Sequence, residues 1–310
     1  MKLAVLAGGV GGARLASGFY QTLAPHDLSV VVNTGDDFRH LGLHISPDLD
    51  TVTYTLAGLA NRDTGWGLAG DSFEALGALE RLGGPAWFRL GDRDLATHLQ
   101  RSLLLSQGLR LTEVTQQVCA ALGVKAAVLP MTDDPVATKV VTAEGVLDFQ
   151  DYFVRRRCEP VVHEVRFDGI EAAAPSPEAA DALRESDAIV IAPSNPFLSV
   201  EPILALRGVR EALASKPVVA VSPIVGGQAI KGPAAKLLRE LGHDVSPLGV
   251  AKRYAGVIRG LVIDREDEKL ADATRALGLE VVVTQTIMRS DQDRASLARD
   301  CIELLRRLGA

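Results

Sequence analysis

The strongest constraint on the fold is a series of short, continuous apolar runs separated by stretches with helical spacing. The chain opens with an apolar run at Leu3–Ala7, continues with helical spacing over Ala13–Leu23, and reaches a β-branched run at Leu28–Asn33. Continuous apolar runs of this length are typical of strands that are buried on both faces of a parallel sheet. The opening therefore predicts a strand–helix–strand unit, which favours an α/β fold.

The same alternation returns in the second part of the chain. Five further runs predict strands, at Ala126–Leu129, Ala188–Ala192, Val218–Val221, Leu261–Ile263 and Val281–Val283. Helical spacing predicts five helices, at Glu178–Glu185, Ile203–Leu213, Pro233–Leu241, Glu266–Leu277 and Ser296–Leu308. Between residues 50 and 122, helical patterns with glycine-rich breaks dominate. We expect one domain of residues 1–310, with a Rossmann-like, mostly parallel sheet, helices on both faces, and a mainly helical insertion at about 50–122.

Composition excludes several classes of protein. The 310 residues are 47% hydrophobic and 23% charged, with a net charge of −6, which is ordinary for a globular protein. The longest basic tract is Arg155–Arg157, so we expect no nucleic-acid partner. No segment approaches the roughly eighteen apolar residues of a membrane span, and the three cysteines are far apart. A reducing, cytoplasmic location without a membrane partner is therefore expected.

The segment Asn33–Thr51 is the most informative for function. It contains four carboxylates, at Asp36, Asp37, Asp48 and Asp50. Crowding like charges costs free energy unless a cation neutralises them. Oxygen-only ligands suit a hard cation such as Mg²⁺, so this cluster predicts a magnesium site.

Two other interpretations of the same segment stay open. Asp48 or Asp50 could cap a helix that begins near Thr51. His40 and His44 are four residues apart, which is a zinc-ligand spacing on a helix. A glycine and a proline in the same segment would break such a helix, so we favour surface or ligand-contact roles for the two histidines.

The first apolar run ends in a glycine-rich loop that contains Gly8, Gly9, Gly11 and Gly12. Backbone N–H groups at the start of a helix form a ready anion site, so these glycines are candidates for binding phosphate. The loop could instead be a dinucleotide fingerprint, although Arg14 occupies the position of its third glycine. A structural turn without a ligand is the remaining alternative.

Two later strand ends also carry polar or flexible residues. Ser194 and Asn195 stand between two prolines after the predicted strand at 188–192. Ligands of open parallel sheets bind beyond the carboxyl ends of the strands, so both residues are candidate nucleotide contacts. Gly226 and Gly227 could present N–H groups to a phosphate, with Lys231 adding charge, or could form an ordinary loop.

The helical insertion offers one aromatic residue and one cation for ligand binding. Trp66 is flanked by glycines, so it could cover a flat ring or pack in the core. Arg89 precedes an expected helix start at Asp92, and its planar head can stack on a ligand or form hydrogen bonds to it. We expect Trp66 and Arg89 to lie apart from the glycine loop, on the facing wall of the site.

These segments together resemble the 2-phospho-L-lactate transferase and phosphoenolpyruvate transferase family of coenzyme F420 biosynthesis. The resemblance runs in order from residue 8 to about 241, and covers nearly the whole chain. It is carried by GGVGGARL, NTGDD, ISPDLDT, DTGWG, FRLGDRDLATHL, LPMTDDPV, EGVLDFQDYFV, APSNPFLS and VSPIVGG. The resemblance implies that residues 1–310 are one transferase domain.

By this resemblance, the protein transfers a phospho-organic acid from a guanosine diphospho donor to the ribityl hydroxyl of the deazaflavin Fo and releases GMP. The acid is 2-phospholactate, phosphoenolpyruvate or 3-phosphoglycerate, and Mg²⁺ is the expected cofactor. Both partners are small molecules, and a homodimer is one assembly that the resemblance allows. A nucleophile supplied by the substrate agrees with the lack of any nucleophilic motif in the chain.

The resemblance also assigns residues. It places Asp50 and Arg89 at Fo, where Trp66 is our further candidate, and it places Asp50 with Asp36 or Asp37 at the metal and at the catalytic centre. It does not say which of the two neighbouring aspartates binds the ion. Distant relatives with a similar acidic strand end are regulatory proteins that bind nucleotide-sugars without transferase activity, and this is the alternative function.

Overall fold

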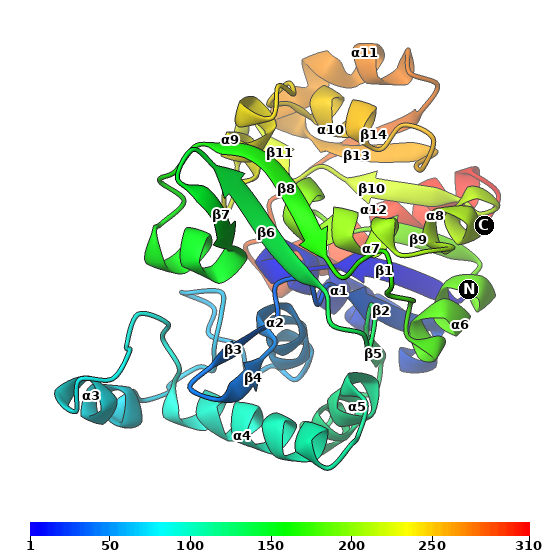
Figure 1. The fold of residues 1–310 in the computed structure, drawn as a ribbon. Helices are drawn as coiled ribbons and strands as arrows, with labels where there is room; N and C mark the ends of the chain where they lie inside the picture. The colour runs from blue at the N-terminus through cyan, green and yellow to red at the C-terminus, as the bar shows by residue number, and fades with distance from the viewer.

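A computed structural model describes residues 1–310, and a sheet of seven parallel strands forms its centre (Figure 1). The strands are β1 (Leu3–Ala7), β2 (Leu28–Val32), β5 (Ala127–Pro130), β9 (Ala188–Ile191), β10 (Val218–Val221), β13 (Gly260–Asp264) and β14 (Glu280–Thr284). Their order across the sheet is β14-β13-β10-β9-β1-β2-β5. The order of addition therefore reverses between β1 and β9, as in a Rossmann fold with one added strand. The predicted fold class is confirmed.

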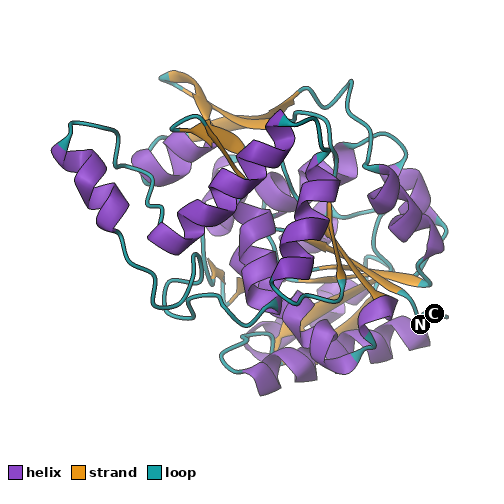
Figure 2. Cartoon of the chain, turned by 90° about the horizontal axis from the view of Figure 1, so that it is seen from below, coloured by secondary structure: helices purple, strands orange, loops and turns teal.

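Helices cover both faces of the sheet (Figure 2). Along β1, Leu3 and Val5 point to one face, where α1 (Gly9–Thr22) and α12 (Asp291–Arg307) pack. Leu6 points to the other face, into a second apolar cluster. Burial on both faces explains why the strands are continuously apolar in the sequence.

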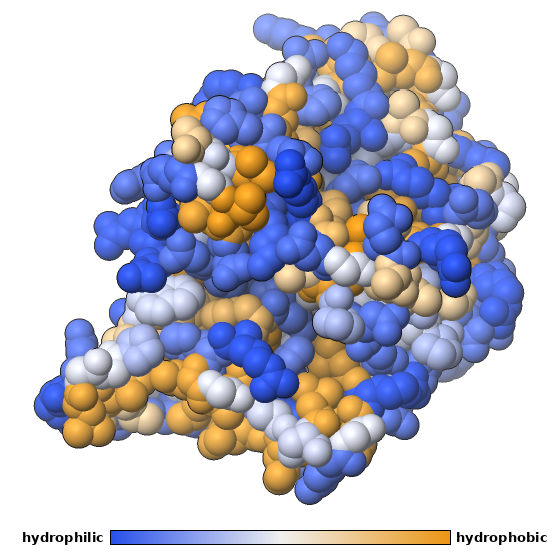
Figure 3. Space-filling model, viewed as in Figure 1, coloured by the Kyte–Doolittle hydropathy of each residue, from blue (hydrophilic) through white to orange (hydrophobic).

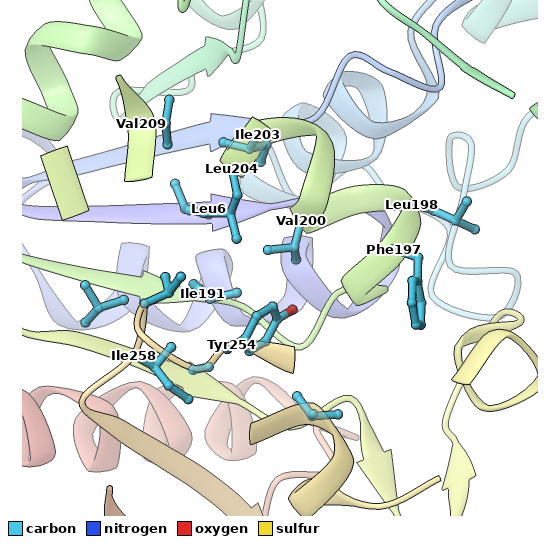
Figure 4. Close-up of a cluster of buried hydrophobic side chains, with 14 of the residues drawn as sticks. Leu6, Ile191, Phe197, Leu198, Val200, Ile203, Leu204, Val209, Tyr254 and Ile258 are labelled. Atoms are coloured by element: carbon cyan, nitrogen blue, oxygen red, sulfur yellow. The ribbon is translucent and has the colours of Figure 1, made fainter. Parts of the chain in front are cut away.

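The helices of the second face follow one another between the later strands. They are α6 (Pro177–Glu185), α7 (Glu201–Ala205), α8 (Val209–Ala214), α9 (Ala234–Glu240), α10 (Pro247–Arg253) and α11 (Ala271–Arg275). Figure 4 shows Ile203, Leu204 and Tyr254 packed around Leu6 and Ile191 of the sheet. The single helix predicted at 203–213 is two helices, because Gly208 adopts a left-handed conformation with φ +83° before α8 begins.

The insertion after β2 is mostly helical. It contains the short hairpin of β3 (Phe38–His40) and β4 (Leu43–Ile45), followed by α2 (Pro47–Leu56), α3 (Glu74–Arg81), α4 (Asp92–Ser106) and α5 (Leu111–Ala121). The exposed leucines Leu82, Leu99 and Leu103 belong to this segment. Figure 3 shows apolar surface along the lower edge of the molecule, where Figure 1 places α3 and α4.

Three small antiparallel sheets, including the β3–β4 hairpin, were not predicted from the sequence. The largest is a sheet of β6 (Ala137–Thr142), β7 (Gly145–Asp148) and β8 (Val162–Asp168), in the order β7-β6-β8. A π-helical turn at Asp151–Arg155 follows β7, and β11 (Ile224–Val225) pairs with β12 (Gln228–Ala229). Among the helices of this chain, none combines the length and the apolar character needed to cross a bilayer.

Candidate active site

A cavity of about 470 Å³ lies at the carboxyl ends of β1 and β9. These strands flank the point where the strand order reverses, which is where open α/β sheets bind ligands. The glycine loop and the end of β9 form its floor, the insertion forms one wall, and the segment after β7 contributes Phe149 and Gln150. One cavity therefore collects residues that lie far apart in the sequence.

Asp36 and Asp48 are the least neutralised carboxylates of the cavity. Asp48 accepts hydrogen bonds from the Gly9 N–H at 2.7 Å and from Asn33 Nδ2 at 3.0 Å. Burial nevertheless raises the pKa of Asp48 to about 6. Burial and the charge of Asp48 raise the pKa of Asp36 well above its usual range, and Asp36 Oδ1 has no hydrogen-bond partner. Asp48 belongs to the acidic cluster predicted from the sequence, but it was not among the predicted metal ligands.

The other two predicted metal ligands bond to protein groups, Asp50 through both oxygens and Asp37 through Oδ2 alone, while Asp37 Oδ1 is buried without a hydrogen-bond partner. Ser46 Oγ donates to Asp37 Oδ2 at 2.7 Å, and His44 Nε2 lies 3.0 Å from the same oxygen. Asp37 does not line the cavity. Asp50 does line the cavity. Its two oxygens accept hydrogen bonds from the two terminal nitrogens of Arg101, which makes a buried, bidentate ion pair.

A buried polar network continues from Asp50 into α4. Arg101 Nη1 lies 3.2 Å from His98 Nδ1, and His98 Nε2 lies 3.3 Å from Asp94 Oδ1. Tyr54 Oη donates to Asp94 Oδ1 at 2.7 Å. Burial works to raise the pKa of Asp94, but the bond to His98 and its charge outweigh it, so the pKa is lowered. Asp50, Asp94 and His98 also offer oxygen and nitrogen atoms close enough to share one ion.

Sequence reasoning missed the role of this face of α4. Asp94, His98 and Arg101 are its buried residues, while Leu99 and Leu103 are exposed. The spacing of four and three residues places the polar group on one side of a helix. The available signal in the sequence of α4 was a polar stripe on one side of the helix and an apolar stripe on the other. Burial of the polar stripe is favourable only where a polar partner such as Asp50 meets it.

The helix α1 begins at Gly9 and not near Ala13, so the predicted glycine loop is the end of β1 and the first turn of α1. This segment, Gly8–Gly12, which we continue to call the glycine loop, packs closely against the protein itself. The Gly8 N–H donates to Ser194 Oγ at 3.1 Å, and the Gly9 N–H is bonded to Asp48. A β-carbon on Gly11 would lie 2.3 Å from the carbonyl oxygen of Pro193. Gly12 faces Ser194 and does not line the cavity, whereas the other three glycines do. The backbone N–H groups of Gly8 and Gly9, which we predicted to bind phosphate, thus already donate hydrogen bonds within the protein.

The end of β9 contributes one unsatisfied donor. Ser194 Oγ joins the ends of β9 and β1 through its bonds to Gly8. Asn195 Oδ1 caps the turn that follows by accepting the N–H groups of Phe197 and Leu198. Asn195 Nδ2 is buried without a partner and the residue lines the cavity, so this nitrogen can donate to a ligand.

The second glycine pair lies outside the cavity lining. Gly226 and Gly227, with φ of +57° and +74°, form the two-residue turn between β11 and β12. The Gly226 N–H donates to Asp267 Oδ2 at 3.0 Å. A tight hairpin turn explains the glycines here. Lys231 does line the cavity, and its Nζ donates to the Thr64 carbonyl oxygen at 2.6 Å.

Aromatic rings line the end of the cavity formed by the insertion. Trp66, Trp87 and Phe88 are all in its lining, and Arg89 lies beside them with its Cζ 4.5 Å above the ring of Phe73. Trp66 is 41% exposed, which favours the ligand-facing interpretation over the core. The stacked pair Phe149 and Phe153, with ring centroids 5.3 Å apart, adds further aromatic lining.

Two expectations about the insertion need correction. The segment next to Trp66 contacts the glycine loop, because a β-carbon on Gly65 would lie 3.0 Å from Val10 Cγ1. Trp66 therefore lies beside the glycine loop and not apart from it. His40 packs edge-on against Trp87 in the β3–β4 hairpin, with burial lowering its pKa, and His44 is bonded to Asp37. His40 is buried and neither histidine lines the cavity, so the surface or ligand-contact roles that we favoured are wrong, whereas the expectation that no helix contains both is confirmed.

Comparisons with known proteins agree over the full chain. The family described as 2-phospho-L-lactate transferase CofD matches residues 3–302. The 2-phospho-L-lactate transferase of Methanopyrus kandleri is 42% identical, with 99% of each chain covered, and that of Methanocaldococcus jannaschii is 40% identical, with 97% of each covered. The phosphoenolpyruvate transferase of Streptomyces griseus is 39% identical over 98% of each chain.

A solved structure supports the fold. A UPF0052 family member from Bacillus halodurans superposes with a TM-score of 0.62, covering 97% of this chain and 98% of that one, at 14% identity. Identity this low bears on architecture alone. The match over residues 3–302 and the full-length relatives at about 40% identity show that this protein belongs to the 2-phospho-L-lactate transferase CofD family and is a transferase of that type.

Proposed function

We propose that the protein transfers a phospho-organic acid from a guanosine diphospho donor to the ribityl hydroxyl of Fo, with release of GMP. The observation that carries the proposal is the composition of the cavity at the carboxyl ends of β1 and β9. It combines unneutralised carboxylates and a glycine loop at the strand switch point with an aromatic wall. Each part suits one part of this reaction: a metal-bound diphosphate, a nucleotide phosphate and a flat tricyclic acceptor.

The carboxylates of the cavity fit a divalent cation. Asp36 Oδ1 is buried without a partner, and burial and mutual charge raise the pKa of both Asp36 and Asp48. A hard cation would satisfy the free oxygen and relieve the repulsion. We propose Asp36 and Asp48 as its protein ligands, because both oxygens of Asp50 are paired with Arg101 and Asp37 does not line the cavity.

The reaction requires positioning and charge neutralisation more than covalent chemistry. When bound, Mg²⁺ supplies positive charge next to the diphosphate. The Fo hydroxyl forms a bond to the phosphorus that carries the organic acid, the bridging oxygen leaves with GMP, and the hydroxyl proton passes to a carboxylate of the cavity. Asp50, held rigid by Arg101, orients the hydroxyl, and Asn195 Nδ2 donates to the donor.

The aromatic end of the cavity suits the acceptor. Fo is a flat tricycle with a polar tail, so it needs a stacking surface and polar anchors. Trp87 and Phe88 provide apolar surface at this end, and Arg89 beside them can stack or donate hydrogen bonds. Trp66 lies between this end and the glycine loop. It can therefore contact either Fo or the guanosine diphospho donor.

The direct test is to incubate the full chain with Fo, Mg²⁺ and each of the lactyl, enolpyruvyl and glyceryl guanylylated donors. Mass spectrometry of the deazaflavin product then shows which acid is transferred. Arg89→Ala should raise the KM for Fo while the affinity for GDP stays unchanged. Arg93→Ala, an exposed arginine of the same segment, is the matched control.

Absence of product with all three donors, together with tight binding of a nucleotide-sugar, would favour the regulatory alternative. Full turnover in excess EDTA would reject the role of the metal and leave the transfer reaction standing. Equal loss of Fo and GDP affinity in Arg89→Ala would mean that the variant damages the fold and not one subsite.

A further inference from the structure

A second, smaller pocket lies beside the glycine loop, and three arginines line it. Its volume is about 40 Å³, and Val10 lines both this pocket and the main cavity. Arg14 comes from α1, Arg62 from the loop after α2, and Arg294 from the beginning of α12. The pocket therefore joins three segments that are distant in the sequence, around positively charged groups.

The charges of this pocket do not balance. Asp291 is the one carboxylate that pairs with these arginines: its Oδ2 accepts from Arg62 Nη2 at 2.9 Å, and its Oδ1 lies 3.1 Å from Arg294 Nη1. Arg14 Nη1 donates to the carbonyl oxygen of Met288 at 3.2 Å. Guanidinium groups stay protonated in proteins. Three positive charges and one negative charge leave a surplus of two positive charges.

Arg294 shows that this surplus is unfavourable without a ligand. The residue is only 8% exposed, and its Nε is buried without a hydrogen-bond partner. It also lies in the first turn of α12, where the helix dipole disfavours a cation. Burial lowers the pKa of the guanidinium, and the charges of Arg14 and Arg62 add to this effect while Asp291 opposes it. A buried, unsatisfied donor costs stability unless an acceptor completes the site.

We propose that this pocket binds a phosphate-type oxyanion, which the guanidinium groups of Arg14, Arg62 and Arg294 hold. Arginine matches phosphate oxygens through paired, charge-assisted hydrogen bonds. A site for one water needs only about 10–15 Å³ of such space, so 40 Å³ accommodates a small oxyanion but no nucleoside. Thr55 and Asn61 add polar groups to the lining.

The oxyanion has two sources. It is either free inorganic phosphate or the terminal phosphate of a nucleotide whose remainder occupies the main cavity. The second source is geometrically open because Gly65 lines the small pocket while its neighbours Thr64 and Trp66 line the main cavity. The charge of Arg14 also acts, after burial, to lower the pKa of Lys231 in the main cavity. The two pockets are therefore close enough to influence each other.

Titration calorimetry with inorganic phosphate, at constant ionic strength, tests the site in the full chain. We expect saturable binding to the wild type, weakened roughly tenfold or more in Arg294→Met and in Arg14→Met, since each variant removes charge-assisted hydrogen bonds. Arg299→Met removes an exposed arginine of the same helix and should change the affinity by less than about twofold. No turnover is measured, so the outcome is independent of the proposed transfer reaction.

A repeat in saturating GDP separates the two sources. Phosphate binding that persists identifies a free-anion site. Phosphate binding that disappears, together with weaker GDP binding in Arg294→Met and Arg14→Met, identifies the nucleotide phosphate as the occupant. Unchanged affinities for both phosphate and GDP in the two variants, or no phosphate binding to the wild type without any effect on GDP, would overturn the proposal. If Arg294→Met fails to fold by circular dichroism, Arg14→Met decides.

Discussion

At the residue scale, the buried pair Asp36 and Asp48 dominates the electrostatics of the cavity. Both carboxylates have raised pKa values, and Asp48 accepts two hydrogen bonds while Asp36 Oδ1 accepts none. Two like charges kept this close without a cation oppose folding. Their behaviour should therefore depend on both pH and Mg²⁺.

The first prediction concerns loss of one ligand. Asp48→Asn should abolish the increase in Tm that Mg²⁺ gives the wild type, and should lower kcat roughly 100-fold, as expected for loss of a major electrostatic contact. Differential scanning fluorimetry with and without Mg²⁺ measures the first effect. Asp168→Asn, an exposed carboxylate at the end of β8, is the control. A normal Mg²⁺ response in Asp48→Asn would remove Asp48 from the metal site.

The second prediction concerns pH in the absence of metal. Burial raises the pKa of Asp48 from 3.8 to about 6, so between these values the folded protein holds a proton that the unfolded chain releases. The free energy of unfolding should then fall as pH rises from about 4 to 6, by an amount on the order of 3 kcal/mol. Urea denaturation in EDTA measures the slope. Asp48→Asn should reduce this slope, with burial of Asp36 still contributing to it, and excess Mg²⁺ should flatten it. An equal slope in Asp48→Asn and the wild type would assign the effect to other groups.

At the element scale, α4 positions the site through its polar face. Its three buried residues are Asp94, His98 and Arg101, and Arg101 neutralises Asp50 on α2. The helix is therefore attached to the rest of the protein by ionic contacts more than by apolar packing. Its exposed leucines cannot compensate for loss of these contacts.

The third prediction tests this attachment. Arg101→Met leaves Asp50 buried without its partner and should lower the free energy of unfolding by about 3–5 kcal/mol. Arg93→Met, on the exposed side of the same helix, should change it by less than about 1 kcal/mol. Urea denaturation of both variants decides. Similar values for the two would show that the Asp50 ion pair does not stabilise the fold.

Close packing at the turn from β1 into α1 leaves no room for a side chain at Gly11. A β-carbon on Gly11 would lie 2.3 Å from a backbone oxygen of Pro193, whereas one on Gly77 in α3 would meet only a flexible arginine end at 3.7 Å. The fourth prediction is therefore that the same substitution, glycine to alanine, changes the stability in opposite directions at these two positions. Gly11→Ala should destabilise the protein, and Gly77→Ala should stabilise it by up to about 1 kcal/mol through helix propensity. Equal Tm changes for both variants would contradict the packing argument.

At the scale of the whole molecule, the site is assembled between the sheet and the insertion. The sheet supplies the glycine loop and the β9 end, while the insertion supplies the aromatic rings. Both tryptophans of the chain, Trp66 and Trp87, line the cavity. Intrinsic fluorescence therefore reports on this one site.

The fifth prediction uses this property. In Trp66→Phe, the remaining Trp87 should be quenched by Fo and not by GDP, because it lies at the aromatic end. In Trp87→Phe, the remaining Trp66 should respond to both ligands, because its segment contacts Val10 of the glycine loop. Steady-state emission during titration measures each response. Quenching of Trp87 by GDP alone would reverse the proposed placement of the two substrates.

The sequence by itself determined the central sheet and the position of the site along the chain. Fully buried strands must be continuously apolar, so β1 and β10 were predicted with their observed bounds and the other five strands to within one residue at each end. The glycine loop and the end of β9 were placed correctly at the cavity because parallel strands bring their carboxyl ends to one edge. These inferences depend on local periodicity, which a single sequence shows.

Only the tertiary structure decided which polar groups are free to act. Asp36, Asp37, Asp48 and Asp50 look equivalent in the sequence, yet Arg101, from fifty-one residues after Asp50, neutralises Asp50 while Asp36 Oδ1 stays unpaired. The surplus charge around Arg294 likewise depends on segments that meet only in the folded protein. The physical reason is that burial and Coulomb interactions depend on distance in space, which local sequence patterns do not specify.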